Sequence, residues 1–233
     1  MVALTPEEWD AIQLSLRVSA VAVLITAPIG IVLAYLLARR RIPAAFVIEN
    51  LIQLPLILPP VVTGWLLLIA FSPEGVFGGW LEDALGIRIV FTWAGAAIAA
   101  GIVAFPLMVQ TMRVAFEQVD PAWEEAGHVY GGTRWDVFRY VTLPLASRGM
   151  AAAVVLAFGR ALGEFGATIV LAGNIPTETR TIPLAIFTNI NRLEGGGAVL
   201  RLVLIAIFLS AASLVVHTAL RRRLTGASDT ARL

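Results

Sequence analysis

Residues 14–38 read LSLRVSAVAVLITAPIGIVLAYLLA and contain a single charged side chain, that of Arg17. A helix needs about 20 apolar residues to cross the roughly 30 Å hydrocarbon core of a bilayer, so this stretch predicts a membrane-spanning helix. Backbone groups in lipid must be paired within their segment, which excludes an isolated strand. Four further stretches have the same apolar character, namely 46–71, 91–112, 150–171 and 198–220. Together they predict an all-α, polytopic integral membrane protein with five spans.

The composition of the whole chain agrees with a membrane protein. Of its 233 residues, 58% are hydrophobic and 14% are charged, and the mean hydropathy is +0.84. These values are too apolar for an ordinary soluble domain. The net charge of +1 argues against a general basic surface, so we expect membrane lipid and no nucleic acid among the partners.

Several kinds of chemistry are excluded by residues that the chain lacks. Without cysteine there is no disulfide framework, thiol nucleophile or thiolate metal site, and the two histidines form no metal pattern. The basic residues are all arginine, so a P-loop of the GxxxxGK[ST] type cannot be built. Any ATP and magnesium chemistry must therefore lie on another chain. We expect this chain to bind no cofactor and not to be an enzyme by itself.

Arginines are divided unevenly among the segments that connect the spans. Eleven lie in 39–43, 113–148 and the tail 221–233, whereas three lie in the opposite set, which comprises the N-terminus, 72–90 and 172–197. Positive charge favours the cytoplasmic side of a membrane. The N-terminus is therefore predicted outside and the C-terminus inside, which fits an odd number of spans.

Two of the spans contain residues that are unusual in a membrane helix. Pro59 and Pro60 predict a kink or break in the second span, which serves either packing alone or a gate. In the fourth span, Arg160 and Glu164 would share one helix face near mid-membrane, either as an ion pair that locks the bundle or as part of an anion path. The candidate path residues are Pro59, Pro60, Thr63, Arg160, Glu164 and Thr168.

The segment predicted outside after the fourth span contains Pro183, which can open a short amphipathic helix through Ile190. Such a helix is too short to cross the membrane. It is interpreted either as a docking surface for an external partner or as a plug over the outer end of the bundle.

The inner loop 113–148 is predicted to form two short helices. Asp120 can cap the first, with Pro121 at its first position, and Gly131 follows its end. Thr133 can cap the second in a capping-box variant, and Leu143-Pro144 is predicted to stop it. Large apolar groups are frequent here, and they either form a partner surface or pack against the spans. They are Trp123, Val129, Tyr130, Trp135, Val137, Phe138 and Tyr140.

The same loop resembles a known family motif. Permease subunits of binding-protein-dependent ABC importers carry a cytoplasmic motif of the form EAA-x(3)-G-x(9)-I-x-LP, in which x is any residue. Glu125-Ala126-Gly127, Gly131, Val141 and Leu143-Pro144 fall on these spacings, with Gly127 in place of alanine and Val141 in place of isoleucine as departures. The resemblance implies a five-helix ABC type-1 importer core over 11–220, a coupling loop over 113–148 and a short cytoplasmic tail. The ATPase-coupling residues that follow from it are Glu124, Glu125, Ala126, Gly127, Gly131, Val141, Leu143 and Pro144.

The cargo is suggested by a second resemblance. The segment LGEFGAT at 162–168, with GNIP at 173–176 and ETRTIP at 178–183, resembles the molybdate branch of these permeases. That branch implies a homodimer in the inner membrane, two ATP-binding cassette subunits and a periplasmic or lipid-anchored oxyanion-binding protein. Tungstate and sulfate or thiosulfate permeases are alternatives within the family, because sulfate and tungstate permeases have similar segments. An ion-coupled secondary transporter is the alternative of another class.

Overall fold

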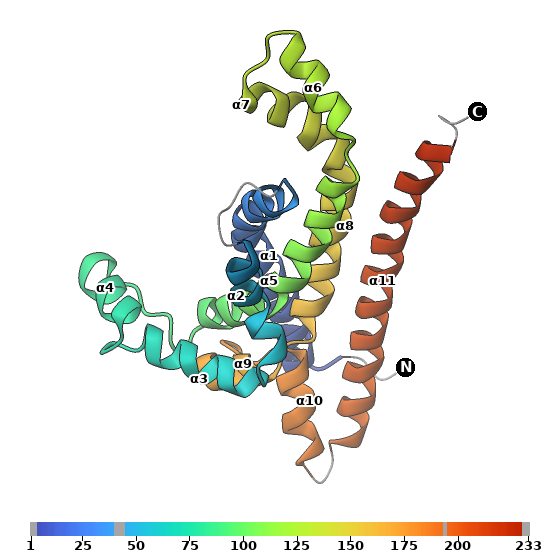
Figure 1. Ribbon diagram of the computed structural model, residues 1–233. Helices are drawn as coiled ribbons and strands as arrows, with labels where there is room; N and C mark the ends of the chain where they lie inside the picture. The colour runs from blue at the N-terminus through green and yellow to red at the C-terminus, as the bar shows by residue number, and fades with distance from the viewer. Residues whose placement is uncertain (1–3, 40–44, 193–194, 230–233) are drawn as a thin grey trace.

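The computed structural model describes residues 4–39, 45–192 and 195–229, and every regular element in these ranges is helical (Figure 1). Four helices are long and apolar enough to cross a membrane, or five if the bent pair α2 and α3 counts as one span. The elements are α1 (Pro6–Ala38), α2 (Ala45–Ile57), α3 (Pro60–Phe71), α4 (Val76–Leu85), α5 (Trp93–Glu117), α6 (Pro121–Val129), α7 (Arg134–Val137), a π-helical turn η1 (Phe138–Thr142), α8 (Leu143–Leu162), α9 (Gly166–Ala172), α10 (Ile182–Ile190) and α11 (Gly196–Asp229).

Helix α5 lies at the centre of the bundle, between α1 and α8. Its alanines Ala96, Ala97, Ala100 and Ala104 belong to the same buried cluster as alanines of α1 and α8. Small side chains let membrane helices approach closely, which replaces the hydrophobic effect that is missing between helices in lipid. At the inner end of α5 the core changes to larger groups, and Phe116 is completely buried.

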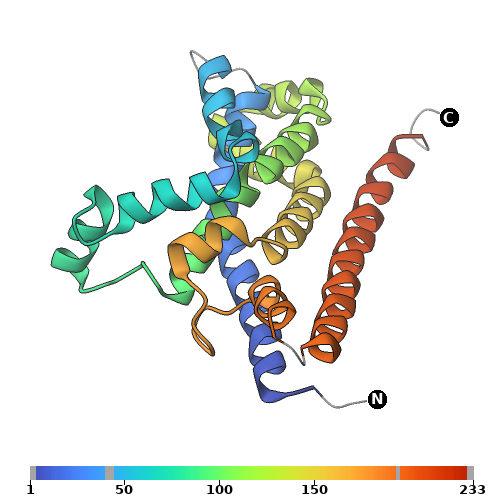
Figure 2. The same cartoon turned by 90° about the horizontal axis from the view of Figure 1, so that it is seen from below.

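Helix α11 stands along one side of the bundle, against α8 and α10 (Figures 1 and 2). A Cβ on Gly159 of α8 would lie 2.8 Å from Ser213 Oγ of α11, and that hydroxyl donates to the Val155 carbonyl at 2.8 Å. His217 Nδ1 lies 2.8 Å from the Ala152 carbonyl oxygen. Glycine and two polar groups thus fix α11 to α8, and His217 has a structural role.

Two of the predicted spans are broken. The break predicted at Pro59 and Pro60 is confirmed, because α2 and α3 meet there at an angle of 110°. The single helix predicted over 150–171 is wrong, since α8 ends at Leu162 and α9 begins at Gly166. The physical reason is local: the Glu164 carboxylate accepts the Ala167 N–H at 2.9 Å and so replaces a backbone partner.

The two breaks lie against each other, since α9 packs on α3. A Cβ on Gly64 would lie 2.7 Å from the Ala167 carbonyl oxygen, and a Cβ on Gly166 would lie 2.8 Å from Pro60 Cβ. Only glycine permits this approach of one backbone to another. The packing of α3 on α9 therefore brings the two broken spans into contact, although Pro59 and Pro60 at the first break stay exposed.

The stop predicted at Leu143-Pro144 is also wrong. The chain continues from α7 through η1 directly into α8, and Pro144 lies in the first turn of α8. Proline clashes with the carbonyl four residues earlier in a regular α-helix. The wider π-type turn, in which Leu143 N–H donates to the Phe138 carbonyl, accommodates it.

Three further features concern the connecting segments. Helix α10 confirms the short helix expected at Pro183, whereas the amphipathic helix α4 was not predicted; α3 and α4 extend sideways from the bundle (Figure 2). The tail expected from residue 221 begins as helix, because α11 runs to Asp229. Arg40 and Arg41 lie outside the described residues.

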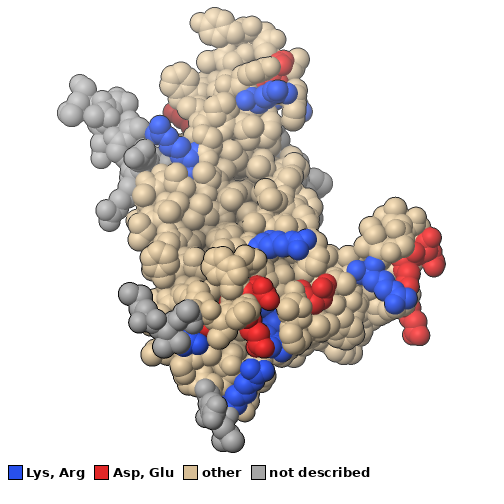
Figure 3. All heavy atoms as spheres, turned by 180° about the vertical axis from the view of Figure 1, so that it is seen from behind, with Lys and Arg blue, Asp and Glu red and all other residues tan. Residues whose placement is uncertain are grey.

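Charged side chains are unevenly distributed on the surface. On the face shown in Figure 3, a broad band without charged side chains separates the charges at the α6–α7 end from those lower down.

We predict that Gly64→Ala destabilises the protein, because the added Cβ meets the backbone of α9, which cannot move aside. Overpacking of this kind costs about 1–3 kcal/mol, and the melting temperature in detergent should fall by roughly 3–8 °C. Gly196→Ala is the matched control, since a Cβ there meets nothing within 4 Å. An unchanged melting temperature for Gly64→Ala would show that α3 and α9 are not tightly packed.

Candidate functional site

The predicted coupling loop, residues 113–148, carries α6 and α7 beyond the ends of α5 and α8, at one end of the molecule (Figure 1). Its predicted caps are confirmed. The Asp120 carboxylate accepts the Ala122 N–H at 2.9 Å, with Pro121 as the first helical residue. Thr133 and Asp136 form a reciprocal capping box at α7. Local sequence therefore determines where both short helices begin.

The turn between α6 and α7 depends on glycine. Gly131 has a φ of +86°, a conformation that side chains with a Cβ rarely adopt, and a Cβ there would meet nothing within 4 Å. Gly127 is needed for a different reason, because a Cβ on it would lie 2.9 Å from Val137 Cγ2 and 3.6 Å from Val141 Cγ2. Gly131 sets the direction of the chain, and Gly127 lets α6 lie close to α7 and η1.

The apolar groups of the loop divide into two sets. Val137 is buried, and Phe138 packs against Tyr35 and Phe116 with ring centroids 4.7 and 6.4 Å apart. The other five are exposed, and Tyr130 reaches 93%. Exposed aromatic groups on short helices indicate a protein partner. The five exposed side chains are Trp123, Val129, Tyr130, Trp135 and Tyr140.

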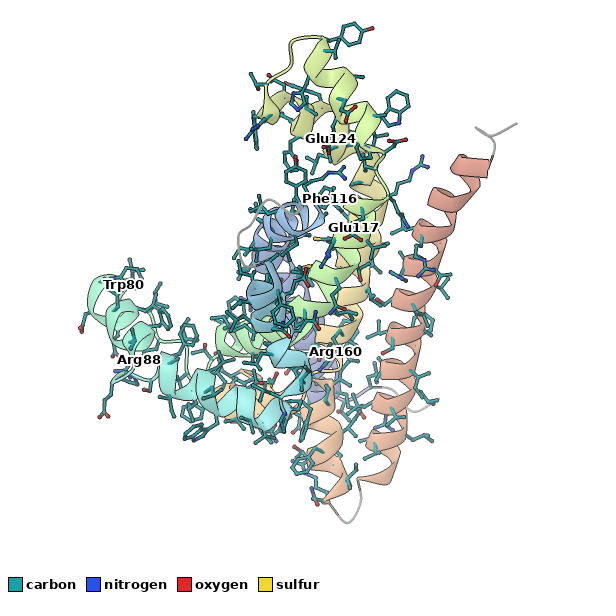
Figure 4. The ribbon with its side chains drawn as sticks, in the orientation of Figure 1. Trp80, Arg88, Phe116, Glu117, Glu124 and Arg160 are labelled. Atoms are coloured by element: carbon teal, nitrogen blue, oxygen red, sulfur yellow. The ribbon has the colours of Figure 1, made fainter. Side chains whose placement is uncertain are left out.

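The neighbouring acids Glu124 and Glu125 lie in opposite environments. Glu125 is exposed, as is Ala126, on the same helix as Trp123. Glu124 is buried, and Figure 4 shows it between the loop helices and the bundle. Its Oε1 accepts hydrogen bonds from Arg39 Nη2 at 2.8 Å and from Thr142 Oγ1 at 2.8 Å. Glu124 therefore does not belong to the exposed surface with which the sequence grouped it.

Sequence reasoning missed Arg39 and Thr142 as members of this loop. Arg39 was interpreted only as part of an arginine run that sets orientation, and no local pattern links it to a glutamate 85 positions away. The remaining motif residues lie where the loop joins α8: Val141 and Leu143 are partly buried, and Pro144 is exposed.

The second group of predicted site residues lies at the breaks in the spans. Arg160 Nη1 donates to Glu164 Oε2 at 2.9 Å, although Glu164 lies beyond the end of α8 and not on one helix face with Arg160. The Glu164 side chain is 2% exposed, whereas that of Arg160 is 31% exposed and labelled in Figure 4. The pair therefore joins the end of α8 to the start of α9 and leaves part of the guanidinium accessible.

The other path candidates lie at the bend between α2 and α3, on α3 and on α9. Pro59 and Pro60 are exposed at the bend between α2 and α3. Thr63 on α3 and Thr168 on α9 are buried. Within the described residues Thr63 Oγ1 has no hydrogen-bond partner. The structure thus brings the six path candidates to one region, where the two broken spans pack together.

A cavity of about 480 Å³ opens at the end of the molecule opposite the coupling loop. It is lined by the first turn of α1, by α10 and by the start of α11, and both signs of charge contribute through Glu7, Glu8, Arg180 and Arg192. Glu8 is already paired with Arg201, whose Nη2 lies 2.7 Å from Glu8 Oε1. The cavity therefore presents mixed charge and no concentrated positive site.

The family model described as "Binding-protein-dependent transport system inner membrane component" matches residues 27–226. The chain is 47% identical over 219 residues to the molybdenum transport system permease protein ModB of Escherichia coli K12, which covers 94% of this chain and 96% of that protein. It is 42% identical to ModB of Haemophilus influenzae, over 93% and 95% of the two chains. It is 36% identical to the sulfate transport system permease protein CysT of E. coli K12, over 83% and 69%.

Solved structures show the same fold at lower identity. A bacterial ABC transporter involved in the import of the polysaccharide alginate superimposes with a TM-score of 0.67 at 20% identity, covering 95% of this chain and 80% of that one. An amino acid ABC transporter gives a TM-score of 0.58 at 19% identity, covering 96% and 100%. At these identities the likeness concerns the fold alone.

We predict that Glu164→Ala lowers the free energy of unfolding by about 3 kcal/mol, because it leaves Arg160 without its carboxylate and Ala167 N–H without its acceptor. Glu164→Gln should cost less, since its amide oxygen can still accept from Ala167. The control is Glu82→Gln, which removes one charge from the exposed Arg88–Glu82 pair and should change stability by less than about 1 kcal/mol. Equal melting temperatures for Glu164→Ala and the control would contradict a stabilising role for the pair.

Proposed function

We propose that this chain, which belongs to the family of binding-protein-dependent transport system inner membrane components, is the permease subunit of an ATP-driven molybdate importer. It is a multi-pass protein of the inner membrane. The assignment of the cargo is supported by the difference in sequence identity to two kinds of relative. Identity to ModB is 47% over nearly the full length of both chains, whereas identity to the sulfate permease CysT is 36% over 69% of that protein.

The proposed orientation places the coupling loop inside and the N-terminus outside. The arginine excess on the segments around α6 and α7 supports it. The C-terminal end of α11 lies at the same end of the molecule as α6 and α7, whereas the start of α1 and α10 lie at the other (Figure 1). If the pairs α2 with α3 and α8 with α9 each form one crossing, the chain crosses the membrane five times.

The proposed ATPase-binding surface is the exposed face of α6 and α7. Glu125, Ala126 and Gly131 fall on the family motif and are exposed, beside Trp123 and Tyr130. A desolvated aromatic centre with a polar rim is the usual composition of a protein interface. ATP and magnesium would bind to the two ATP-binding cassette subunits, and this chain would bind neither.

The transport cycle would use a second copy of the chain and an external binding protein. A pore would form between the two copies, with an oxyanion delivered at the end where α10 lies. ATP binding would bring the two coupling loops together and open the pore outward, and hydrolysis would return it. Arg160 suits a transient contact, because its guanidinium is partly exposed but already paired with Glu164, and a path must bind its ion weakly enough to release it.

The test is uptake of radiolabelled molybdate by proteoliposomes that contain the chain, its cognate ATPase and the binding protein. We expect uptake with ATP and no uptake when the ATPase cannot hydrolyse it. Unlabelled molybdate, tungstate and sulfate serve as competitors, and stronger competition by tungstate or sulfate than by molybdate would reassign the cargo. Uptake that follows an ion gradient without ATP would identify a secondary transporter instead.

We predict that Gly131→Asp abolishes co-purification of the ATPase while the chain still inserts and folds. Aspartate tolerates a positive φ better than most residues, and the space around Gly131 is open within the chain, so a docked partner is what the new side chain would meet. Gly86→Asp is the matched control, because Gly86 also has a positive φ of +64° and open space but lies at the end of α4. Normal co-purification of Gly131→Asp would contradict the proposed docking surface.

A further inference from the structure

One carboxylate oxygen collects three hydrogen bonds at the base of the coupling loop. Glu124 Oε1 accepts from Arg39 Nη2 at 2.8 Å, from Arg39 Nε at 3.1 Å and from Thr142 Oγ1 at 2.8 Å. Arg39 Nη2 also donates to the Val119 carbonyl at 3.2 Å. The Arg39 and Glu124 side chains are 12% and 10% exposed, and Thr142 is completely buried.

These four residues come from four different segments. Arg39 is the residue that ends α1, Glu124 lies in α6, Thr142 is the last residue of η1 before α8, and Val119 lies between α5 and α6. Among the described residues, helix α6 packs mainly against α7 and η1. The Arg39–Glu124 pair therefore links α6 directly to the end of α1, and the Thr142 hydroxyl links α6 to the start of α8.

The pair resists separation. A buried charge that loses its partner is costly, so α6 cannot move away from the end of α1 without exposing or orphaning Glu124. The π-helical turn adds to this, because it brings Thr142 to Glu124 at the point where α8 begins, and such turns are frequent at functional sites. When α6 is displaced, we therefore expect α1 and α8 to move with it, because its contacts with them are costly to break.

We propose that Arg39, Glu124 and Thr142 form a joint that transmits movement of the coupling helix α6 to the membrane helices. The proposal rests on the function proposed above and extends it to residues that do not contact the ATPase. They are positioning residues: Glu125 and its exposed neighbours bind the partner, and Glu124 carries the resulting movement inward through α1 and α8.

The experiment measures three quantities on the complete complex in proteoliposomes: ATPase co-purification, ATP hydrolysis and molybdate uptake. Arg39→Gln and Glu124→Gln should leave co-purification intact and hydrolysis active, but lower the molybdate taken up per ATP hydrolysed about tenfold, in keeping with the loss of hydrogen bonds to a charged group. Thr142→Val should lower this ratio about twofold to threefold, and Thr142→Ser, which keeps the hydroxyl, should restore it. Arg88→Gln, at the exposed pair on α4, is the matched control and should not change the ratio.

Thr142→Val keeps the test decisive if the charge variants fail to fold, because it removes one hydroxyl and keeps the size of the side chain. If the folded variants have a lower melting temperature but an unchanged ratio of molybdate taken up to ATP hydrolysed, the proposed joint is overturned. The Arg39–Glu124 pair would then have only a structural role. Loss of co-purification in Glu124→Gln would overturn it in favour of a docking role for Glu124. No ATP-driven uptake by the unaltered complex would overturn the proposed function itself, and with it the joint.

Discussion

Hydrocarbon supplies no hydrogen-bond partners, and this constraint governs where the chain can interrupt its helices. The two predicted spans that the structure interrupts, at α2–α3 and at α8–α9, place their breaks in the same region, where Gly64 and Gly166 allow the two backbones to touch. The Glu164 carboxylate then accepts a backbone N–H that the break has freed. The contact between α3 and α9 and the Glu164 side chain together stabilise the interrupted backbone of this region.

The same chemical arrangement occurs at both ends of α8. At its start, Glu124 accepts from Arg39 and from the Thr142 hydroxyl; at its end, Glu164 accepts from Arg160 and from the Ala167 N–H. Helix α8 has 20 residues, about 30 Å, and no break between these two clusters. A rigid helix with one ion-paired carboxylate at each end is suited to carry a displacement from the coupling loop to the broken spans.

Local patterns in the sequence predicted what depends on neighbouring residues. The caps at Asp120 and Thr133, the short helix at Pro183 and the bend at Pro59 and Pro60 all follow from groups within a few positions of each other. The sequence could not separate Glu124 from Glu125, because adjacent residues on a helix point about 100° apart and only the packing of α6 decides which one faces inward. The continuation through Pro144 depends on the π-type turn, which the residues of Phe138–Thr142 do not distinguish from an α-helical turn.

The two departures from the family motif lie close together in the structure. Gly127 stands where the motif has alanine and Val141 where it has isoleucine, and each is smaller by one carbon. A Cβ on Gly127 would lie 3.6 Å from Val141 Cγ2 and 2.9 Å from Val137 Cγ2, so the two positions face each other across the α6–η1 interface. Glycine at 127 lets α6 lie close to Val137 of α7, and the position stays in ordinary contact with Val141 of η1. The motif therefore describes the internal packing of the loop, through positions such as 127 and 141, as well as the exposed surface at 125, 126 and 131.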